Sequence, residues 1–286
     1  MTWLDDERLM TGSRDGSIAV WDMSTEQPQQ NYACPENRTT VRFSNAPVVR
    51  RWRHQPPSLG LCSTEGGKVR SSQLDAGRRE LATLGADGML KLWDLTSLDV
   101  QRVVPLVNAQ SAVALAFTPE RQLYAVGSLL HTDFYDVRLP KPHCMSAESL
   151  DGDWGVRSLA FGSSNTVAVG GGLGRISFFD LRRGDYLQVD KADIVPHRPL
   201  PLKPRKVPRF GMFPEDEENE GDTVRCEIRT GRGWFRMDDV MMKQLSLRDV
   251  RHAAYTLAYD PSGTRLFAGG GPLELGLMGA YASVWL

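Results

Sequence analysis

Basic side chains recur in this sequence at two kinds of position, and both kinds suit the binding of carboxylates or of a protein partner. The first set lies in glycine-containing turns or just before apolar segments, and it comprises Arg14, Lys68, Arg70 and Arg157. The second set places an arginine two residues after an acid, as in Asp136 with Arg138 and Asp180 with Arg182. Guanidinium groups bind carboxylates through charge-assisted, often bidentate hydrogen bonds, and their planar fork suits protein interfaces. The chemistry that these residues offer is recognition.

Sequence motifs of the common enzyme classes do not occur in a convincing form. Residues 169–174 (V-G-G-G-L-G) resemble a dinucleotide-binding loop, but they lie between two expected strands and lack the helix that would hold the phosphates. Gly66-Gly67-Lys68 lacks the Ser or Thr that follows the lysine of a P-loop. No G-x-S-x-G or H-E-x-x-H motif occurs, and the five histidines are dispersed. The sequence favours a non-catalytic binding protein without a cofactor.

Composition limits the partners that this chain can be expected to bind. The 286 residues are 41% hydrophobic and 24% charged, and the formal net charge is −1. Nucleic acid is not expected as the main partner, because phosphate binding needs a strong basic surplus. The four scattered cysteines form no C-x-x-C pair, which indicates reduced thiols and argues against zinc. We find no signal peptide and no membrane-length apolar run, and we expect the cytoplasm and nucleus without deciding between them.

A repeated pattern predicts the elements that must position the basic residues. In each copy an apolar segment leads through a glycine-containing turn into an alternating segment that ends in an aromatic residue, usually followed by Asp. The five copies end at Asp22, Asp94, Asp136, Asp180 and Trp285. Asp-Gly turns supply the positive φ angles of a tight hairpin, and alternation at period two is typical of strands. Each copy therefore predicts two antiparallel strands.

The spacing of the copies predicts the fold. A further apolar strand precedes three copies, and equivalent aromatic residues lie about 42 to 44 residues apart from Trp93 to Phe179, which matches the period of WD repeats. We therefore predict an all-β WD-repeat β-propeller over residues 1–286. Its five recognisable blades are residues 1–32, 66–100, 110–145, 153–190 and 250–286. Propellers carry four to eight blades, so we expect an incomplete seven-blade ring, as in a fragment or a shortened isoform. A β-sandwich with chance Trp-Asp pairs is the alternative.

Two insertions interrupt the expected blades. Residues 33–65 are rich in proline and predict a loop. Residues 191–225 contain a basic, proline-rich stretch and an acidic run, and we expect disorder because such sequence buries too little apolar area to offset its conformational entropy. A proline-rich partner motif is the alternative there. Residues 234–250 favour a short amphipathic helix docked on the propeller.

The order of the motifs resembles the DDB- and cullin-associated factor 12 family. These motifs are G-S-R-D-G, K-V-R, F-Y-D-V-R, V-R-S-L-A-F, F-F-D-L-R and G-G-G-P-L-E-L-G-L-M-G-A-Y-A-S-V-W. The last motif, residues 269–285, is the most specific because generic WD repeats lack it. The resemblance implies a substrate receptor of a cullin-4-RING ubiquitin ligase that recruits proteins ending in two glutamates for ubiquitination. The family's N-terminal portion has no counterpart in these residues.

The resemblance also implies roles for the two basic sets. The positions matching Arg14, Lys68, Arg70 and Arg157 bind the acidic tail, and strand direction places them at one mouth of the channel, the top. The positions matching Asp136, Arg138, Asp180 and Arg182 contact the propeller-built adaptor on the opposite, bottom face. Asp22 and Asp94 are not followed by arginine, an asymmetry that would orient the adaptor.

Plainer interpretations of both sets remain open at this point. The top-face cations would then be rim charges paired with Asp15, Asp87 or solvent, and the bottom-face arginines would pair only with their own aspartates. The corresponding functions are a WD-repeat scaffold without ligase contact, or a truncated product without function.

Overall fold

The computed structural model describes residues 1–13, 17–22, 48–53, 68–97, 99–190, 223–230, 234–237, 252–273 and 277–285. Apart from one short 3₁₀ turn, η1 (Gly152–Trp154), every regular element in these ranges is a strand. The prediction of an all-β fold is confirmed. No helix in this part of the chain has the length and apolarity needed to cross a membrane.

The described strands form six antiparallel sheets, of which five are the blades. Blade 1 contains β1 (Thr2–Trp3), β2 (Arg8–Gly12), β3 (Ser17–Asp22) and β4 (Val48–Arg53). Blade 2 contains β5 (Val69–Asp75), β6 (Glu80–Gly85), β7 (Met89–Asp94) and β8 (Val100–Pro105). Blade 3 contains β9 (Ala114–Thr118), β10 (Leu123–Gly127), β11 (His131–Asp136) and β12 (His143–Glu148). Blade 4 contains β13 (Val156–Phe161), β14 (Thr166–Gly171), β15 (Arg175–Asp180), β16 (Asp185–Tyr186) and β19 (Glu227–Arg229). Blade 5 contains β21 (His252–Tyr259), β22 (Leu266–Pro272), β23 (Leu277–Trp285) and β20 (Trp234–Met237).

One strand register recurs in all five blades. The aromatic residue near the end of each third strand lies opposite an apolar residue of the second strand. The pairs are Leu9–Trp21, Leu81–Trp93, Tyr124–Tyr135, Val167–Phe179 and Leu266–Trp285. In blades 1 and 2 the indole N–H also donates to a threonine hydroxyl of the second strand, from Trp21 to Thr11 at 2.8 Å and from Trp93 to Thr83 at 2.7 Å. The repeat seen in the sequence is therefore one shared strand pairing.

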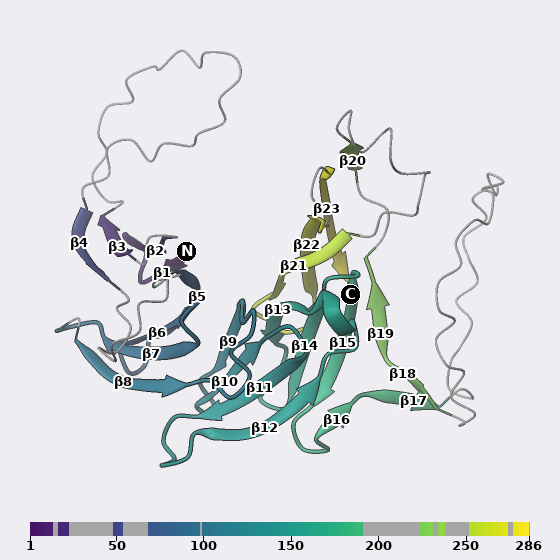
Figure 1. Cartoon of the computed structure of the whole chain (residues 1–286), viewed down its shortest axis with the longest axis horizontal. Coiled ribbons are helices and arrows are strands. Elements are labelled where there is room, and N and C mark those ends of the chain that lie inside the picture. Colours follow the sequence, from purple (N-terminus) through teal and green to yellow (C-terminus); the bar gives the residue numbers. More distant parts are fainter. Residues whose placement is uncertain are drawn as a thin grey trace.

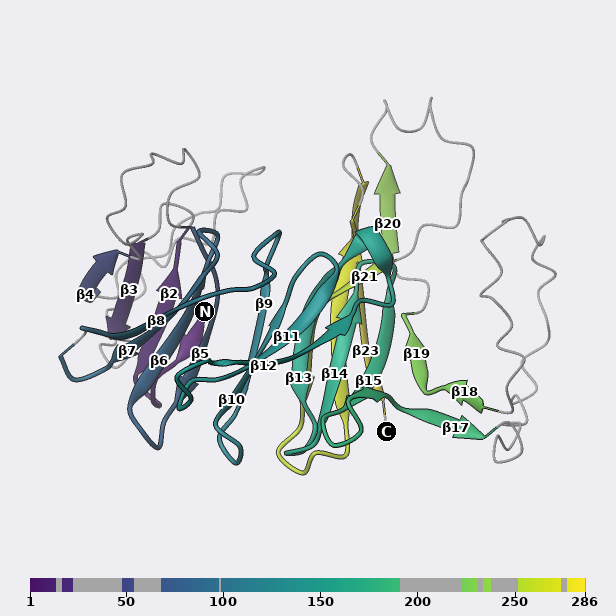
Figure 2. The same ribbon diagram turned by 60° about the horizontal axis from the view of Figure 1, so that its bottom comes forward.

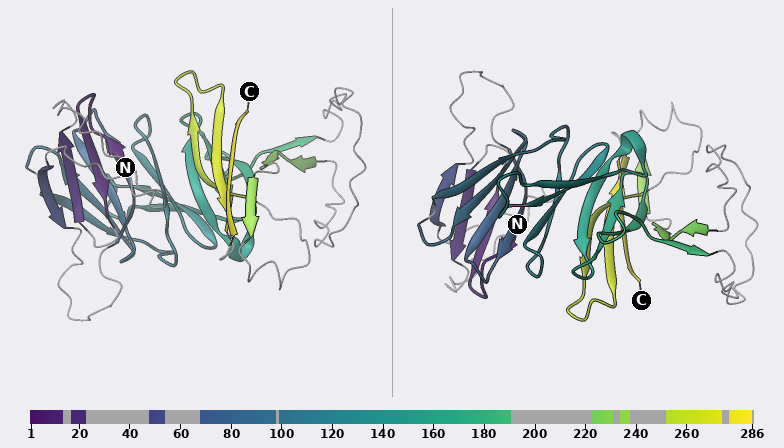
Figure 3. Two further views of the ribbon diagram at one scale, coloured as in Figure 1. Left: turned by 90° about the horizontal axis from the view of Figure 1, so that it is seen from above. Right: turned by 90° about the horizontal axis from the view of Figure 1, so that it is seen from below.

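The blades follow one another along an arc (Figure 1). Successive sheets lie side by side in the other views as well (Figure 2; Figure 3). The contacts between neighbouring blades run mainly through their first strands, β1 to β5, β5 to β9, β9 to β13 and β13 to β21. Five blades in a propeller arrangement confirm the predicted fold class, and the arc is that of an incomplete propeller. The number of blades in a closed ring stays a prediction.

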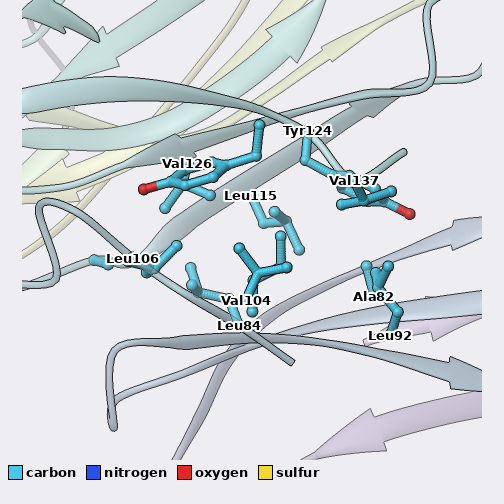
Figure 4. Packing of buried hydrophobic residues seen from close by; sticks show 12 residues of the cluster. Ala82, Leu84, Leu92, Val104, Leu106, Leu115, Tyr124, Val126 and Val137 are labelled. Carbon is cyan, nitrogen blue, oxygen red and sulfur yellow. The ribbon is translucent and has the colours of Figure 1, made fainter. Parts of the chain in front are cut away.

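Buried apolar side chains gather between neighbouring blades. Between blades 2 and 3, for example, Leu84 and Val104 pack against Leu115 and Val126, all buried (Figure 4). Full burial of one such side chain contributes roughly 1.5–3 kcal/mol, so packing against its neighbours stabilises each blade. This packing fixes the position of one blade's turns relative to the next.

The structure corrects the sequence-based boundaries in three places. Residues 48–53, inside the expected loop 33–65, form β4, so the loop prediction is wrong for them. Residues 234–237, where we expected the start of a helix, form β20, because the free edge of β23 offers hydrogen-bond partners that local helix propensity does not outweigh. Residues 223–225, at the end of the expected insertion 191–225, form β18. The rest of these segments lies outside the described residues.

The third correction concerns the outer strand of blade 4. Two residues of β16 pair with the end of β15, and β19 pairs with its beginning at Arg175–Ser177. Between them, β17 (Gln188–Asp190) and β18 (Thr223–Arg225) leave the sheet as a two-stranded ribbon. The insertion therefore emerges from the middle of an outer strand and not from a connection between blades.

Candidate functional site

Strand direction gives each propeller two functional faces. The top face carries the turns between the second and third strands of each blade, such as residues 85–89, and the bottom face carries the turns that follow the third strands. First strands begin at the top, because the three strands are antiparallel. Arg70 and Arg157 therefore lie at the top face, and the Asp136 and Asp180 turns lie at the bottom.

Arg70 and Arg157 occupy the same unusual position in their blades. Val69 lies opposite Gly85 and Ser71 opposite Leu84, so Arg70 is the additional residue of a β-bulge. Val156 lies opposite Gly171 and Ser158 opposite Gly170, so Arg157 is also a bulged residue. A bulge leaves one residue outside the strand pairing and redirects its side chain, and bulges are frequent beside functional sites.

The same contact with the preceding blade fixes each bulge. The Val69 N–H donates to the Ser13 carbonyl at 3.1 Å, and the Val156 N–H donates to the Ser128 carbonyl at 3.0 Å. Beneath each valine lies a glycine: a Cβ added at Gly12 would lie 2.5 Å from Cγ1 of Val69, and one added at Gly127 would lie 2.5 Å from Cγ1 of Val156. The start of each bulged strand is therefore held rigidly against its neighbour.

The four basic residues of the top set differ in their surroundings. Arg70 is exposed, whereas Arg157 is half-buried and donates from Nε to the Trp154 carbonyl at 2.9 Å. Lys68 is half-buried, and its carbonyl accepts a bond from the Ala86 N–H at 2.7 Å. Arg14 lies outside the described residues.

The described acids in the turns of the top face form no ion pairs with Arg70 or Arg157. Asp87, one of the partners considered for the top set, forms an ion pair with Lys91 of its own blade at 3.5 Å. Within the part of the chain that the structure describes, no ion pair involves Arg70 or Arg157. Asp15, the other acid considered, lies outside that part. Among the described cations of the top set, Lys68, Arg70 and Arg157, none forms an ion pair with Asp87.

The bottom-face arginines form the ion pairs that the plain interpretation predicted, and they also stay exposed. Arg138 donates from Nε and Nη2 to the two carboxylate oxygens of Asp136, at 2.8 and 2.6 Å. Arg182 does the same with Asp180, at 3.3 and 3.0 Å. The hydrogen bonds from these guanidiniums hold the pKa of each aspartate below its usual range. The arginine side chains are nevertheless 52% and 67% exposed, so a partner can reach them.

Contacts between blades add residues to the bottom face that the sequence did not single out. Arg102 of β8 donates to the carbonyls of Val137 and Leu139, on either side of Arg138. Arg121 donates to the Asn165 side chain of blade 4, and its carbonyl accepts a bond from Arg138 at 3.1 Å. The bonds of the Arg102 and Arg121 side chains join residues 35 or more positions apart, so no local pattern reveals them. Together they brace the turn that presents Arg138.

A Ser–His–Asp cluster in blade 3 does not have the geometry of a catalytic triad. Ser146 Oγ donates to the buried carboxylate of Asp133 at 2.5 Å and lies 3.0 Å from His143 Nε2. The same Nε2 lies 3.6 Å from Asp133. In a triad the serine and the acid face opposite imidazole nitrogens, whereas here both face Nε2. Asn108 also donates to Asp133 at 2.9 Å, so this is a polar cluster around a buried acid.

Comparison with protein families yields one match that spans nearly the whole chain. The model of the DDB1- and CUL4-associated factor 12 β-propeller matches residues 1–207 and 212–286. The match includes every residue of the top and bottom sets and all five blades.

Proposed function

Because the chain belongs to the DDB1- and CUL4-associated factor 12 β-propeller family, we propose that it acts as a substrate receptor for acidic protein tails, without catalysis of its own. The family implies a role as a cullin-4 substrate receptor and association with the DDB1–cullin-4 ligase. The substrate class goes further: proteins whose chains end in two glutamates, bound at the top face and presented for ubiquitination.

The observation that carries the tail-binding proposal is the repeated bulge. It places Arg70 and Arg157 at equivalent points of the top face, each on a strand start that the preceding blade holds in place. A tail that ends in two glutamates offers three carboxylates, counting the terminal one. Guanidiniums that have no acidic partner among the described residues, and that lie on backbone held by a neighbouring blade, suit such a ligand, because little order is lost when the ion pairs form. Lys68 and Arg14 are included in the proposed site.

The bottom face is proposed as the contact with the DDB1 adaptor. Asp136, Arg138, Asp180 and Arg182 lie in the turns of two adjacent blades, 3 and 4, and both guanidiniums are exposed. Blade 2 differs, since its Asp94 accepts bonds from the backbone N–H groups of Thr96 and Ser97 and from the side chain of Gln101, where the aspartates of blades 3 and 4 accept bonds from arginine. A partner that needs arginines would therefore sit over blades 3 and 4.

The second candidate function is a scaffold without ligase contact. The pairing of Arg138 and Arg182 with their own aspartates favours it, because paired arginines offer less to a partner. Co-precipitation of DDB1 from cells separates the two candidates. We expect the wild-type chain to bring down the adaptor and the Arg138→Ala/Arg182→Ala variant to lose it, whereas the scaffold predicts no difference between them.

Tail binding is tested with the purified chain and a fluorescent peptide that ends in two glutamates. Arg70→Glu and Arg157→Glu should each abolish binding, and Arg265→Glu, an exposed arginine in a blade 5 bottom turn, serves as the charge-matched control. A second peptide with glutamines in place of both glutamates measures binding that does not depend on the tail acids. Equal binding of the two peptides would overturn the proposed substrate class.

A further inference from the structure

Blade 5 contains a third bulge at the position of Arg70 and Arg157, and its bulged residue is Tyr255. Ala254 lies opposite Gly270 and Thr256 lies opposite Gly269, so Tyr255 is left outside the pairing of β21 with β22. Its side chain is 44% exposed. In blade 3 the matching residue is Val113, and β9 begins one residue later, at Ala114, so no bulge lies within that strand. A bulge therefore recurs at Arg70, Arg157 and Tyr255.

Tyr255 and Arg157 are neighbours across the boundary between blades 4 and 5. The hydroxyl of Ser158, the residue after Arg157, donates to the carbonyl of Ala254, the residue before Tyr255, at 2.5 Å. Gly170 allows this approach, because a Cβ there would lie 2.5 Å from the Ser158 hydroxyl and 2.9 Å from the Ala254 Cβ. Strands β13 and β21 thus bring their bulged residues together at the top face.

The electrostatics of the phenol agree with this geometry. Burial raises the pKa of the Tyr255 hydroxyl, and the charge of Arg157 acts in the opposite direction. The hydroxyl therefore carries its proton at neutral pH and is a hydrogen-bond donor. Its bond to the Pro272 carbonyl is 3.4 Å long, against about 2.7–2.8 Å for a good O–H···O bond, so a carboxylate could replace it at little cost.

We propose that Tyr255 also contacts the tail, an inference that rests on the proposed tail binding. Its hydroxyl donates a hydrogen bond to the carboxylate that Arg157 binds. Arg157 commits its Nε to the Trp154 carbonyl, and its two terminal nitrogens form no bond with other described residues, so both are available to a carboxylate. A guanidinium and a phenol beside it can then donate hydrogen bonds to the two oxygens of one carboxylate. Arg70, two blades away, would bind a different carboxylate of the tail.

Removal of one oxygen tests this proposal. Tyr255→Phe in the full chain should raise the Kd for the peptide ending in two glutamates by about tenfold. This is the usual effect of losing one hydrogen bond to a charged group. Tyr259→Phe is the matched control, because it removes the same atom from the opposite, bottom end of β21, where Tyr259 packs over Gly162. We expect Tyr259→Phe to leave the Kd unchanged. Equal Kd values for Tyr255→Phe and the wild type would overturn the proposal.

Peptides with single substitutions identify the carboxylate. In the wild type, each exchange of one tail glutamate for glutamine, and amidation of the terminus, should weaken binding. One of these peptide changes should no longer weaken binding to the Arg157→Ala variant, because the carboxylate that it removes has lost its partner. The same peptide change should weaken binding to Tyr255→Phe less than it weakens binding to the wild type. Sensitivity of the two variants to different carboxylates would overturn the shared contact. Failure of the wild type to bind any acidic peptide would instead refute the proposed function itself.

Discussion

The top and bottom faces use the same side chain, arginine, in opposite ways. At the top, Arg70 and Arg157 emerge from β-bulges, and the described residues provide them with no acid. At the bottom, Arg138 and Arg182 are each held by an aspartate two residues earlier. The top is therefore electrostatically prepared for an incoming carboxylate. At the bottom, the aspartates balance the charge of the arginines and fix their geometry. This arrangement favours a partner that is complementary in shape and offers backbone carbonyls as hydrogen-bond acceptors.

The largest expected effect is the loss of one function without the other. Arg157→Glu should weaken tail binding by about 2–5 kcal/mol, the range for breaking a buried charge pair, and should leave the adaptor bound. Arg182→Glu should do the reverse. Both variants are measured in the same two assays, peptide binding and co-precipitation of DDB1. If either substitution in a folded protein removes both interactions, the division into two faces is wrong.

The second-largest expected effect comes from replacing the glycines that leave room for the valines at the top-face bulges. Gly127→Ala places a Cβ 2.5 Å from Cγ1 of Val156, so the chain must shift, and overpacking of this kind costs about 1–3 kcal/mol. We expect a lower midpoint in chemical denaturation and weaker tail binding, since Arg157 follows Val156. Gly77→Ala, whose Cβ would meet only an Asp75 oxygen at 3.4 Å, should change neither. Unchanged tail binding in Gly127→Ala would show that the bulge need not be rigid.

The strand pairs could be predicted from the sequence, but the bulges that present the top-face residues could not. The strand pairs could be read from it, because an apolar segment, a glycine-containing turn and a segment that ends in an aromatic residue recur in the same order along the chain. The bulges could not, since they depend on whether a residue such as Val69 finds a glycine and a free carbonyl in the previous blade. For the same reason Arg102 was missed, as its acceptors lie in another blade. Tyr255 carries no charge, so the pattern of basic residues that defines the top set does not include it.

A smaller effect is expected from pH, with a different midpoint at each face. Free glutamate carboxylates titrate near pH 4.3, and binding to arginine lowers their pKa, so tail affinity should be full above that value and fall as pH drops through it. The pKa values of Asp136 and Asp180 are already lowered by their arginines, so their ion pairs persist to more acidic pH. Titration from pH 7 to pH 4 should therefore release the peptide before DDB1. Release in the opposite order would contradict the assignment of charges to the two faces.

The smallest expected effect comes from completing the bottom-face pattern in blade 2. Thr96 stands where blades 3 and 4 have arginine, and its N–H already bonds to Asp94 as those of Arg138 and Arg182 bond to their aspartates. Thr96→Arg should therefore form a third acid–arginine turn. Exposed ion pairs contribute little, so we expect DDB1 binding to tighten by about 0.5 kcal/mol at most, measured by competition with the wild type. Ser97→Arg adds the same charge one residue away and should have no effect. Weaker DDB1 binding by Thr96→Arg alone would mean that the adaptor lies over blade 2 and requires a small side chain there, so the arginines of blades 3 and 4 would mark its edge and not its centre.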